Sequence, residues 1–165
     1  MILRTDAQRI TDVSPAFYEL IKHFEGLRLT AYLDTGQVPT IGIGTTVYPN
    51  GKRVALGDKC SEQDAYNYLR HDVSLVIKKV DAATRDDITQ GMFDALVSFS
   101  YNTGRYSDTT LYKRVNQNPI EYSAITAQFV KWKYDNGKVI AGLLRRRRCE
   151  AYLYEHGVNV AGWYL

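Results

Sequence analysis

The sequence predicts an α+β fold, in which one helix is followed by a small three-stranded antiparallel sheet and then by a larger helical region. Apolar residues alternate in two short runs after residue 26, whereas elsewhere they recur at the spacing of a helix face. A chain of 165 residues can bury a sizeable core. We therefore expect a single domain over 1–165, with a helix and sheet lobe at about 14–58, a helical lobe at about 61–157 and a C-terminal tail at 158–165.

The first helix is predicted from Ser14 to Glu25. Ser14 is a suitable N-cap residue, and Pro15 fits the first helical position. One face of the helix carries Phe17, Leu20, Ile21 and Phe24. Because Gly26 is a typical helix-ending residue, the helix should stop at Glu25.

Two alternating runs and one turn signal predict the sheet. Residues 27–32 alternate in polarity, and DTGQVP at 34–39 reads as a turn. Residues 40–48 alternate again. Asn50-Gly51 is a strong type I′ hairpin signal before a third strand at 52–56.

The chain after residue 60 is predicted to be helical. Ser61 should cap one helix, and Thr89 should open a strongly apolar helix that closes near Gly104 and forms the centre of the core. Shorter helices are expected around 109–115, 119–134 and 141–157. A ligand is expected in the cleft between the sheet and the helical lobe.

Composition and charge narrow the function classes. The net charge of +3 is uneven, since residues 111–165 carry nine basic and four acidic groups. Such a basic region would favour binding to an anionic polymer, although the simpler interpretation is that these charges lie on a solvated helix face. No run reaches transmembrane length, and the N-terminus is too polar for a signal peptide, so we expect accumulation in the cytoplasm. Cys60 and Cys149 lack paired spacing, which predicts two largely buried thiols.

The candidate catalytic residues surround the predicted turn. A carboxylate is disfavoured at a helix C-terminus, so local stability gives no reason for Glu25, although it could be exposed or paired with an arginine. Asp34 and Thr40 have ordinary explanations as a turn residue and a strand residue. The hairpin nevertheless folds them toward each other beside Glu25. An acid, a second carboxylate and a hydroxyl suffice for glycoside hydrolysis. Gly42 would allow substrate to approach the sheet closely.

The Glu-x8-Asp-x5-Thr pattern within EGLRLTAYLDTGQVPTIGIGTT resembles the active-site signature of bacteriophage lysozymes, the muramidase endolysins of T-even and lambdoid phages. GDKCSEQDAYNYLRHDV, FDALVSFSYNTG and NGKVIAGLLRRRRCEAYL extend the resemblance to the lambdoid branch over roughly residues 14–156. It implies a lysozyme-like fold and hydrolysis of the β-1,4 bond between N-acetylmuramic acid and N-acetylglucosamine in peptidoglycan. By the same resemblance, Glu25 is the general acid, and Asp34 and Thr40 position water in an inverting reaction without a cofactor.

The resemblance also implies partners and location. The enzyme would wait as a monomer in the host cytoplasm until a holin opens the membrane, and would then reach the periplasm and cell wall. We expect neither a nucleic-acid partner nor a stable membrane anchor. Substrate-binding candidates in the cleft are Gly42, Tyr101 and Asn102. Trp132 and Tyr134 are expected in the core or the cleft wall.

Three alternatives remain. A lytic transglycosylase also needs a catalytic glutamate, but it uses no water, so Asp34 and Thr40 would have no task. A non-catalytic peptidoglycan-binding protein would have no reason to keep all three residues. A tail-associated lysozyme domain would be expected to carry a further module.

Other clusters favour structural roles. Arg145–Arg148 would spread around a helix, so one or two should face inward toward carboxylates, and one could steady Glu25. His23, His71 and His156 lack metal-site spacing, which argues against a zinc amidase. Cys149 and His156 are seven residues apart, too far along a helix for the nucleophile and base of a cysteine peptidase.

Overall fold

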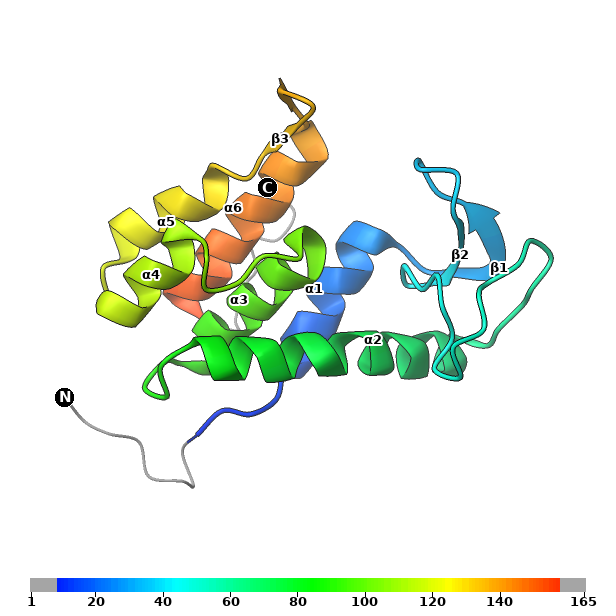
Figure 1. The fold of residues 1–165 in the computed structure, drawn as a ribbon, viewed down its shortest axis with the longest axis horizontal. Coiled ribbons are helices and arrows are strands. Elements are labelled where there is room, and N and C mark those ends of the chain that lie inside the picture. Colours follow the sequence, from blue (N-terminus) through cyan, green and yellow to red (C-terminus); the bar gives the residue numbers. More distant parts are fainter. Residues whose placement is uncertain (1–8, 158–165) are drawn as a thin grey trace. The chain divides into compact units, whose positions relative to one another are not determined.

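The computed structural model describes residues 9–157 (Figure 1). Its elements in chain order are α1 (Pro15–Glu25), β1 (Arg28–Leu33), β2 (Pro39–Gly42), α2 (Glu62–Ala83), α3 (Gln90–Thr103), α4 (Thr110–Gln117), α5 (Tyr122–Val130), β3 (Tyr134–Asp135), β4 (Lys138–Val139) and α6 (Ala141–His156). The chain divides into two compact units. The small unit is Glu19–Leu75, and the large unit contains the described residues before and after it. Both divisions fall inside a helix, α1 and α2 respectively.

The sheet of the small unit has two strands rather than the predicted three. β1 and β2 are antiparallel, with Tyr32 opposite Thr40. The chain turns at Asn50-Gly51, but not in the predicted type I′ conformation, because only Gly51 has a positive φ and its N–H donates to the Tyr48 carbonyl. The third segment makes only the isolated bridge between Val47 and Arg53. The chain turns away after Val54, because the Ala55 N–H donates to the carboxylate of Asp58 instead of to a strand.

The ends of the helices in the small unit follow the sequence prediction. α1 ends at Glu25, and Gly26 adopts a φ of 73° that suits glycine. Ser61 caps α2, since its hydroxyl accepts from the Asp64 N–H while the Asp64 carboxylate accepts from the Ser61 N–H. Ser14 behaves differently from the prediction. Its hydroxyl donates to Asp94 on α3 and does not cap α1.

The core of the large unit is built on α3. Every residue from Gly91 to Ser100 is buried, and α6 packs against both α3 and α5. The Thr89 hydroxyl accepts from the Met92 N–H, and Gly104 ends the helix in the left-handed conformation, so both predicted boundaries are confirmed.

One helix of the large unit is shorter than predicted. α5 ends at Val130, and the chain then forms the two-stranded hairpin β3–β4. Asn136 and Gly137 have φ angles of 47° and 76°, as a type I′ turn requires. The Asn-Gly signal was present in the sequence, and it outweighed the helical pattern of the preceding residues.

Candidate active site

Glu25 is the last residue of α1 and is half-buried. Gly44 lies beside it, since a Cβ built at position 44 would stand 3.4 Å from Glu25 Oε2. Gly44 also has a φ of 82°, which disfavours any side chain. The backbone conformation therefore favours glycine at position 44, and a Cβ added there would be in ordinary van der Waals contact with the Glu25 carboxylate.

A tight turn, residues 41–45, holds Gly44 in place. The N–H of Ile41 donates to the Thr45 carbonyl at 2.9 Å, and the Thr45 N–H donates back at 3.0 Å. The Thr45 hydroxyl donates to Asp72 Oδ2 on α2 at 2.9 Å, and burial raises the pKa of Asp72. Thr45 and Asp72 were not predicted. Asp72 could have been noticed in the sequence, because it lies three residues after the core residue Leu69 and therefore on the same face of the helix.

Gly42 has a packing role in this turn. A Cβ at position 42 would stand 3.0 Å from the Cβ of Ala65 on α2, so only glycine lets the turn pack against that helix. The residue is buried. Packing against Ala65 is enough to explain why residue 42 is glycine, with no need for contact with substrate.

Asp34 is fixed by the turn that it begins. Its Oδ1 accepts from the Val38 N–H at 2.8 Å, while its own N–H donates to the Val38 carbonyl at 3.1 Å. Among residues 9–157, Asp34 Oδ2 accepts no hydrogen bond. One carboxylate oxygen is thus anchored, and the other is available to a ligand or to water.

Thr40 is in β2 and is only 3% exposed. Its hydroxyl donates to the Val38 carbonyl at 3.0 Å. Because that bond uses the hydroxyl proton, the oxygen faces its remaining surroundings as an acceptor. Val38 therefore orients both Asp34 and Thr40 through its backbone.

Tyr32 is related to all three candidate residues, through strand pairing with Thr40 and through the charges of Glu25 and Asp34. It is opposite Thr40 in the sheet, and the Arg28 guanidinium is 4.4 Å from the centre of its ring. Burial raises the pKa of Tyr32, Arg28 lowers it, and the charges of Glu25 and Asp34 both raise it. Tyr32 thus lies in the electric field of both carboxylates and opposite Thr40. Sequence reasoning missed Tyr32, although it stands in the strand between Glu25 and Asp34.

The arginine run of the large unit divides as predicted. Arg146 and Arg147 are buried, whereas Arg145 and Arg148 are exposed. Both buried guanidiniums donate to Glu150, from Arg146 Nε at 3.2 Å and from Arg147 Nη1 at 2.7 Å. The cluster of Arg146, Arg147 and Glu150 is completed by other polar groups: Glu150 also accepts from the Ser98 hydroxyl, and Asn102 accepts from Arg147.

The remaining candidate residues of the large unit differ in how far they are exposed to solvent. Asn102 is exposed but is tied to the buried Arg147, and Tyr101 is half-buried. The Trp132 ring is half-buried and contacts the ring of the core residue Phe99 edge to face, with centroids 5.4 Å apart. Tyr134 is in β3 and is 54% exposed.

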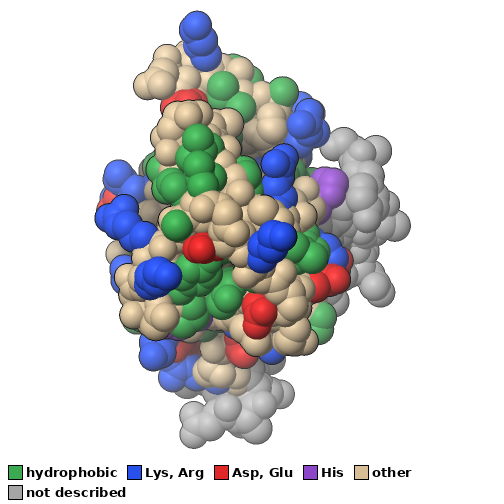
Figure 2. Space-filling model, turned by 90° about the vertical axis from the view of Figure 1, so that its right-hand side faces the viewer, with side chains coloured by type: hydrophobic (Ala, Val, Ile, Leu, Met, Phe, Trp, Pro, Cys, Tyr) green, Lys and Arg blue, Asp and Glu red, His purple; other side chains and the backbone are tan. Residues whose placement is uncertain are grey.

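Cys60 and Cys149 are thiols, as predicted, and burial raises the pKa of each. Within residues 9–157, no three histidine, cysteine or acidic side chains gather in a way that could hold a metal ion. None of the helices in that range is long and apolar enough to cross a membrane. On the face drawn in Figure 2, lysines and arginines are scattered among apolar and acidic side chains.

Comparisons with known proteins extend over most of the chain. The sequence model of the family described as phage lysozyme matches residues 22–150. The endolysin of Bacillus phage B103 is 39% identical over 150 residues, which are 88% of this chain and 55% of that protein. This chain thus spans about half the length of that relative. The endolysin of Salmonella phage P22 is 33% identical over 136 residues, which are 81% of this chain and 91% of that protein.

A solved structure gives the same result. The endolysin from Escherichia coli O157:H7 phage FAHEc1 is 36% identical, with a TM-score of 0.83, over 92% of this chain and 98% of that one. The lysozyme-like fold and the resemblance seen in the sequence are therefore confirmed. The chain belongs to the phage lysozyme family.

Proposed function

We propose that this chain is an endolysin, a glycoside hydrolase that cleaves the β-1,4 bond between N-acetylmuramic acid and N-acetylglucosamine in peptidoglycan and so lyses the host cell. The observation that carries the proposal is that, in a member of the phage lysozyme family, Glu25 ends the helix before the sheet, while Asp34 and Thr40 flank the turn that joins its two strands. The proposed catalytic domain includes both units.

Glu25 is the proposed general acid. Cleavage of the glycosidic bond requires a proton on the leaving oxygen as the bond to the sugar carbon breaks. Glu25 is half-buried at the end of a helix, and Gly44 of the 41–45 turn lies beside its carboxylate. A carboxyl of this kind can deliver its proton to a bound oxygen with little reorganisation.

Asp34 and Thr40 are proposed to hold the attacking water. Asp34 Oδ2 and the Thr40 hydroxyl oxygen are both acceptors, so together they can take the two protons of one water. A lone pair of that water would then point at the sugar carbon. The carboxylate of Asp34 also draws the proton away as the new bond forms.

This arrangement predicts an inverting reaction, because the water attacks the face opposite to the leaving oxygen. Inverting enzymes separate their two carboxyl groups by about 6.5–9.5 Å to leave space for that water. Proton NMR of the first product formed tests the stereochemistry. The α-anomer is expected to appear first. An initial β-anomer would overturn inversion and leave hydrolysis in place.

The chemistry of the products tests the activity itself. Purified peptidoglycan should be digested in isotopically labelled water, and the soluble fragments analysed by mass spectrometry. We expect fragments with reducing muramic acid ends that carry one labelled oxygen. Anhydro-muramic ends would instead identify a lytic transglycosylase, and released peptides an amidase or peptidase. Absence of soluble fragments would indicate a binding protein.

The family also supports a proposal for when the enzyme acts. The endolysin would remain in the host cytoplasm as a monomer until a holin opens the membrane, and then act in the periplasm and wall without a nucleic-acid partner. Expression in the host with and without a holin tests the timing. Lysis without the holin would contradict it, and light scattering of the purified protein would test the monomer.

A further inference from the structure

A pocket lies in the small unit. It has a volume of about 440 Å³, and its lining includes Tyr48, Asn50, Lys52, Asp58, Lys59 and Tyr68. None of Glu25, Asp34 and Thr40 lines it. The volume is within the range of small-ligand sites. The pocket is therefore large enough for a sugar residue and distinct from the proposed catalytic residues.

One wall of the pocket is aromatic and fixed. Tyr48, from the 46–54 hairpin, meets Tyr68 of α2 edge to face, with centroids 5.1 Å apart. The Tyr48 hydroxyl donates to Asp58 Oδ2 at 2.9 Å, and the Ala55 N–H donates to the same oxygen at 2.9 Å. These bonds hold the Tyr48 ring in one orientation. The Tyr48 ring, with the Tyr68 ring at 67° to it, thus offers an apolar face with a polar edge, which matches the C–H face and the hydroxyl rim of a pyranose.

The pocket also carries positive charge. Lys52 and Lys59 are exposed, and neither forms an ion pair with another described residue. Asp58 supplies one negative charge, but its carboxylate already accepts from Tyr48 and Ala55. The hydrogen bonds from Ala55 and Tyr48, and then the charge of Lys52, lower the pKa of Asp58, but the lining still has an excess of one positive charge from its two ammonium groups. Each is a compact charge with three donors, which suits a carboxylate or a phosphate.

We propose that this pocket is a second binding site, for a saccharide that carries an anionic group. The sugar ring would pack on Tyr48 and Tyr68, while its carboxylate or phosphate would bind Lys52 and Lys59. Muramic acid supplies the carboxylate in a cell wall, and sugar phosphates supply the other form of the same chemistry. The site would hold an anionic wall polymer without cleaving it.

Binding of small probes tests the site independently of catalysis. The protein should be titrated by NMR with N-acetylmuramic acid, with N-acetylglucosamine 1-phosphate and with neutral N-acetylglucosamine. We expect the ring signals of Tyr48 and Tyr68 to shift with at least one anionic probe and to respond less to the neutral sugar. The probe that binds more tightly identifies carboxylate or phosphate as the natural group. Equal response to the neutral sugar, or no shift at these rings, would overturn the proposal.

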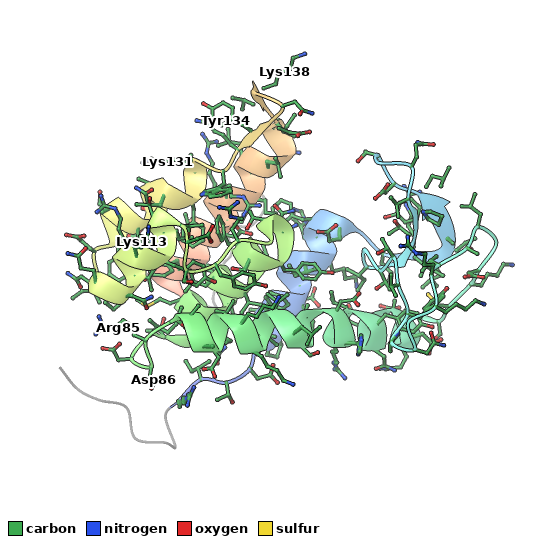
Figure 3. The ribbon with its side chains drawn as sticks, in the orientation of Figure 1. Arg85, Asp86, Lys113, Lys131, Tyr134 and Lys138 are labelled. Atoms are coloured by element: carbon green, nitrogen blue, oxygen red, sulfur yellow. The ribbon has the colours of Figure 1, made fainter. Side chains whose placement is uncertain are left out.

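A matched pair of double variants tests the charges. Lys52→Gln with Lys59→Gln removes two exposed charges from the pocket. Lys113→Gln with Lys131→Gln removes two exposed charges from the large unit (Figure 3). The pocket variant should bind the anionic probe about five- to tenfold more weakly, and the control should bind like wild type. Equal weakening in both variants would show general electrostatic attraction and overturn the site. This binding measurement does not depend on catalysis by Glu25, so it tests the pocket even if the proposed hydrolytic function is wrong.

Discussion

Thr40 combines a structural hydrogen bond with a proposed catalytic one. Its hydroxyl donates to Val38, and its oxygen is proposed to accept from the attacking water. Thr40→Val keeps the shape of the side chain but removes both bonds. We expect this change to lower kcat by about a hundredfold through misplacement of the water, and stability by about 1 kcal/mol. Activity assays and urea unfolding measure the two effects.

Thr40→Ser is the matched control, because it keeps the hydroxyl and loses a methyl group. It should retain most of the activity. If the valine variant matched the serine variant in kcat, Thr40 would have a packing role alone.

Asp94 gives a prediction about stability and pH. It is fully buried in α3, and burial raises its pKa, while hydrogen bonds from Ser14 and Gln90 lower it. The folded protein therefore holds the proton of Asp94 more tightly than the unfolded chain does. Its contribution to stability is complete below the unfolded pKa of about 3.9 and is lost as pH rises through the folded pKa.

Unfolding free energies at several pH values test this sign. The stability of wild type minus that of Asp94→Asn should fall as pH rises from about 3 to about 6. Asp86→Asn, at an exposed position, is the control and should follow wild type. A difference that stays constant or grows with pH would contradict the prediction.

Asp94 and Asp72 also show which residue pairs the sequence could not reveal. Their partners, Ser14 and Thr45, are 80 and 27 residues away in sequence. Local patterns contain no information about such pairs. Glu25, by contrast, stood out because its position at a helix end is locally unfavourable.

At the scale of elements, the 41–45 turn has a testable requirement for glycine. Gly44 and Gly51 have nearly equal φ angles of 82° and 84°. A Cβ at 44 would contact the Glu25 carboxylate, whereas a Cβ at 51 would meet open space. Gly44→Ala and Gly51→Ala should each cost about 1 kcal/mol of stability, because both force alanine into a left-handed conformation.

Activity should distinguish these two variants. We expect Gly44→Ala to lower kcat at least tenfold, because relief of the backbone strain at this positive φ would shift the turn beside the Glu25 carboxylate, and a 1 Å displacement of a catalytic group can cost about a hundredfold. Gly51→Ala should act like wild type on peptidoglycan. Equal activity in both would mean that contact with the turn does not position Glu25.

Element boundaries were predictable where local chemistry decides them. Gly26, Ser61, Thr89 and Gly104 mark helix ends through caps or left-handed conformations, and the structure has each of them in place. The third strand was not predictable in the same way. Whether it pairs depends on the contact between Ala55 and Asp58, which no alternation of polarity encodes.

At the scale of the whole molecule, the cluster of Arg146, Arg147 and Glu150 tests the core of the large unit. Glu150 is fully buried and accepts from both guanidiniums. Glu150→Gln would leave two buried cations without the carboxylate that neutralises them. We expect this change to cost about 3–5 kcal/mol of unfolding free energy, measured by urea denaturation.

Glu155→Gln is the matched control on the same helix. Glu155 is exposed, so its loss should change stability by no more than about 0.5 kcal/mol. A cost below about 1 kcal/mol for Glu150→Gln would mean that the cluster does not need its negative charge. The sequence predicted that one or two arginines face inward, but it could not identify Glu150 as their partner, because arginines at four consecutive positions offer every face of a helix.

The fold class and the family were predictable from the whole sequence because several motifs occur in the expected order. The short hairpin β3–β4 and the site residue Tyr32 were missed. A two-residue strand leaves almost no periodic signal, and a tyrosine in a strand is ordinary. These features depend on packing and on the electric field of neighbours.

The most direct test of the account is the rate of peptidoglycan hydrolysis by Glu25→Gln, compared with wild type and with Glu19→Gln. Glu19 is an exposed glutamate on the same helix, so its variant controls for the loss of one charge. If Glu25 is the general acid, Glu25→Gln should be slower by a factor of about 10²–10⁴, while Glu19→Gln should be as fast as wild type and all three should unfold at the same temperature. Hydrolysis by a folded Glu25→Gln variant at the wild-type rate would contradict Glu25 as the general acid.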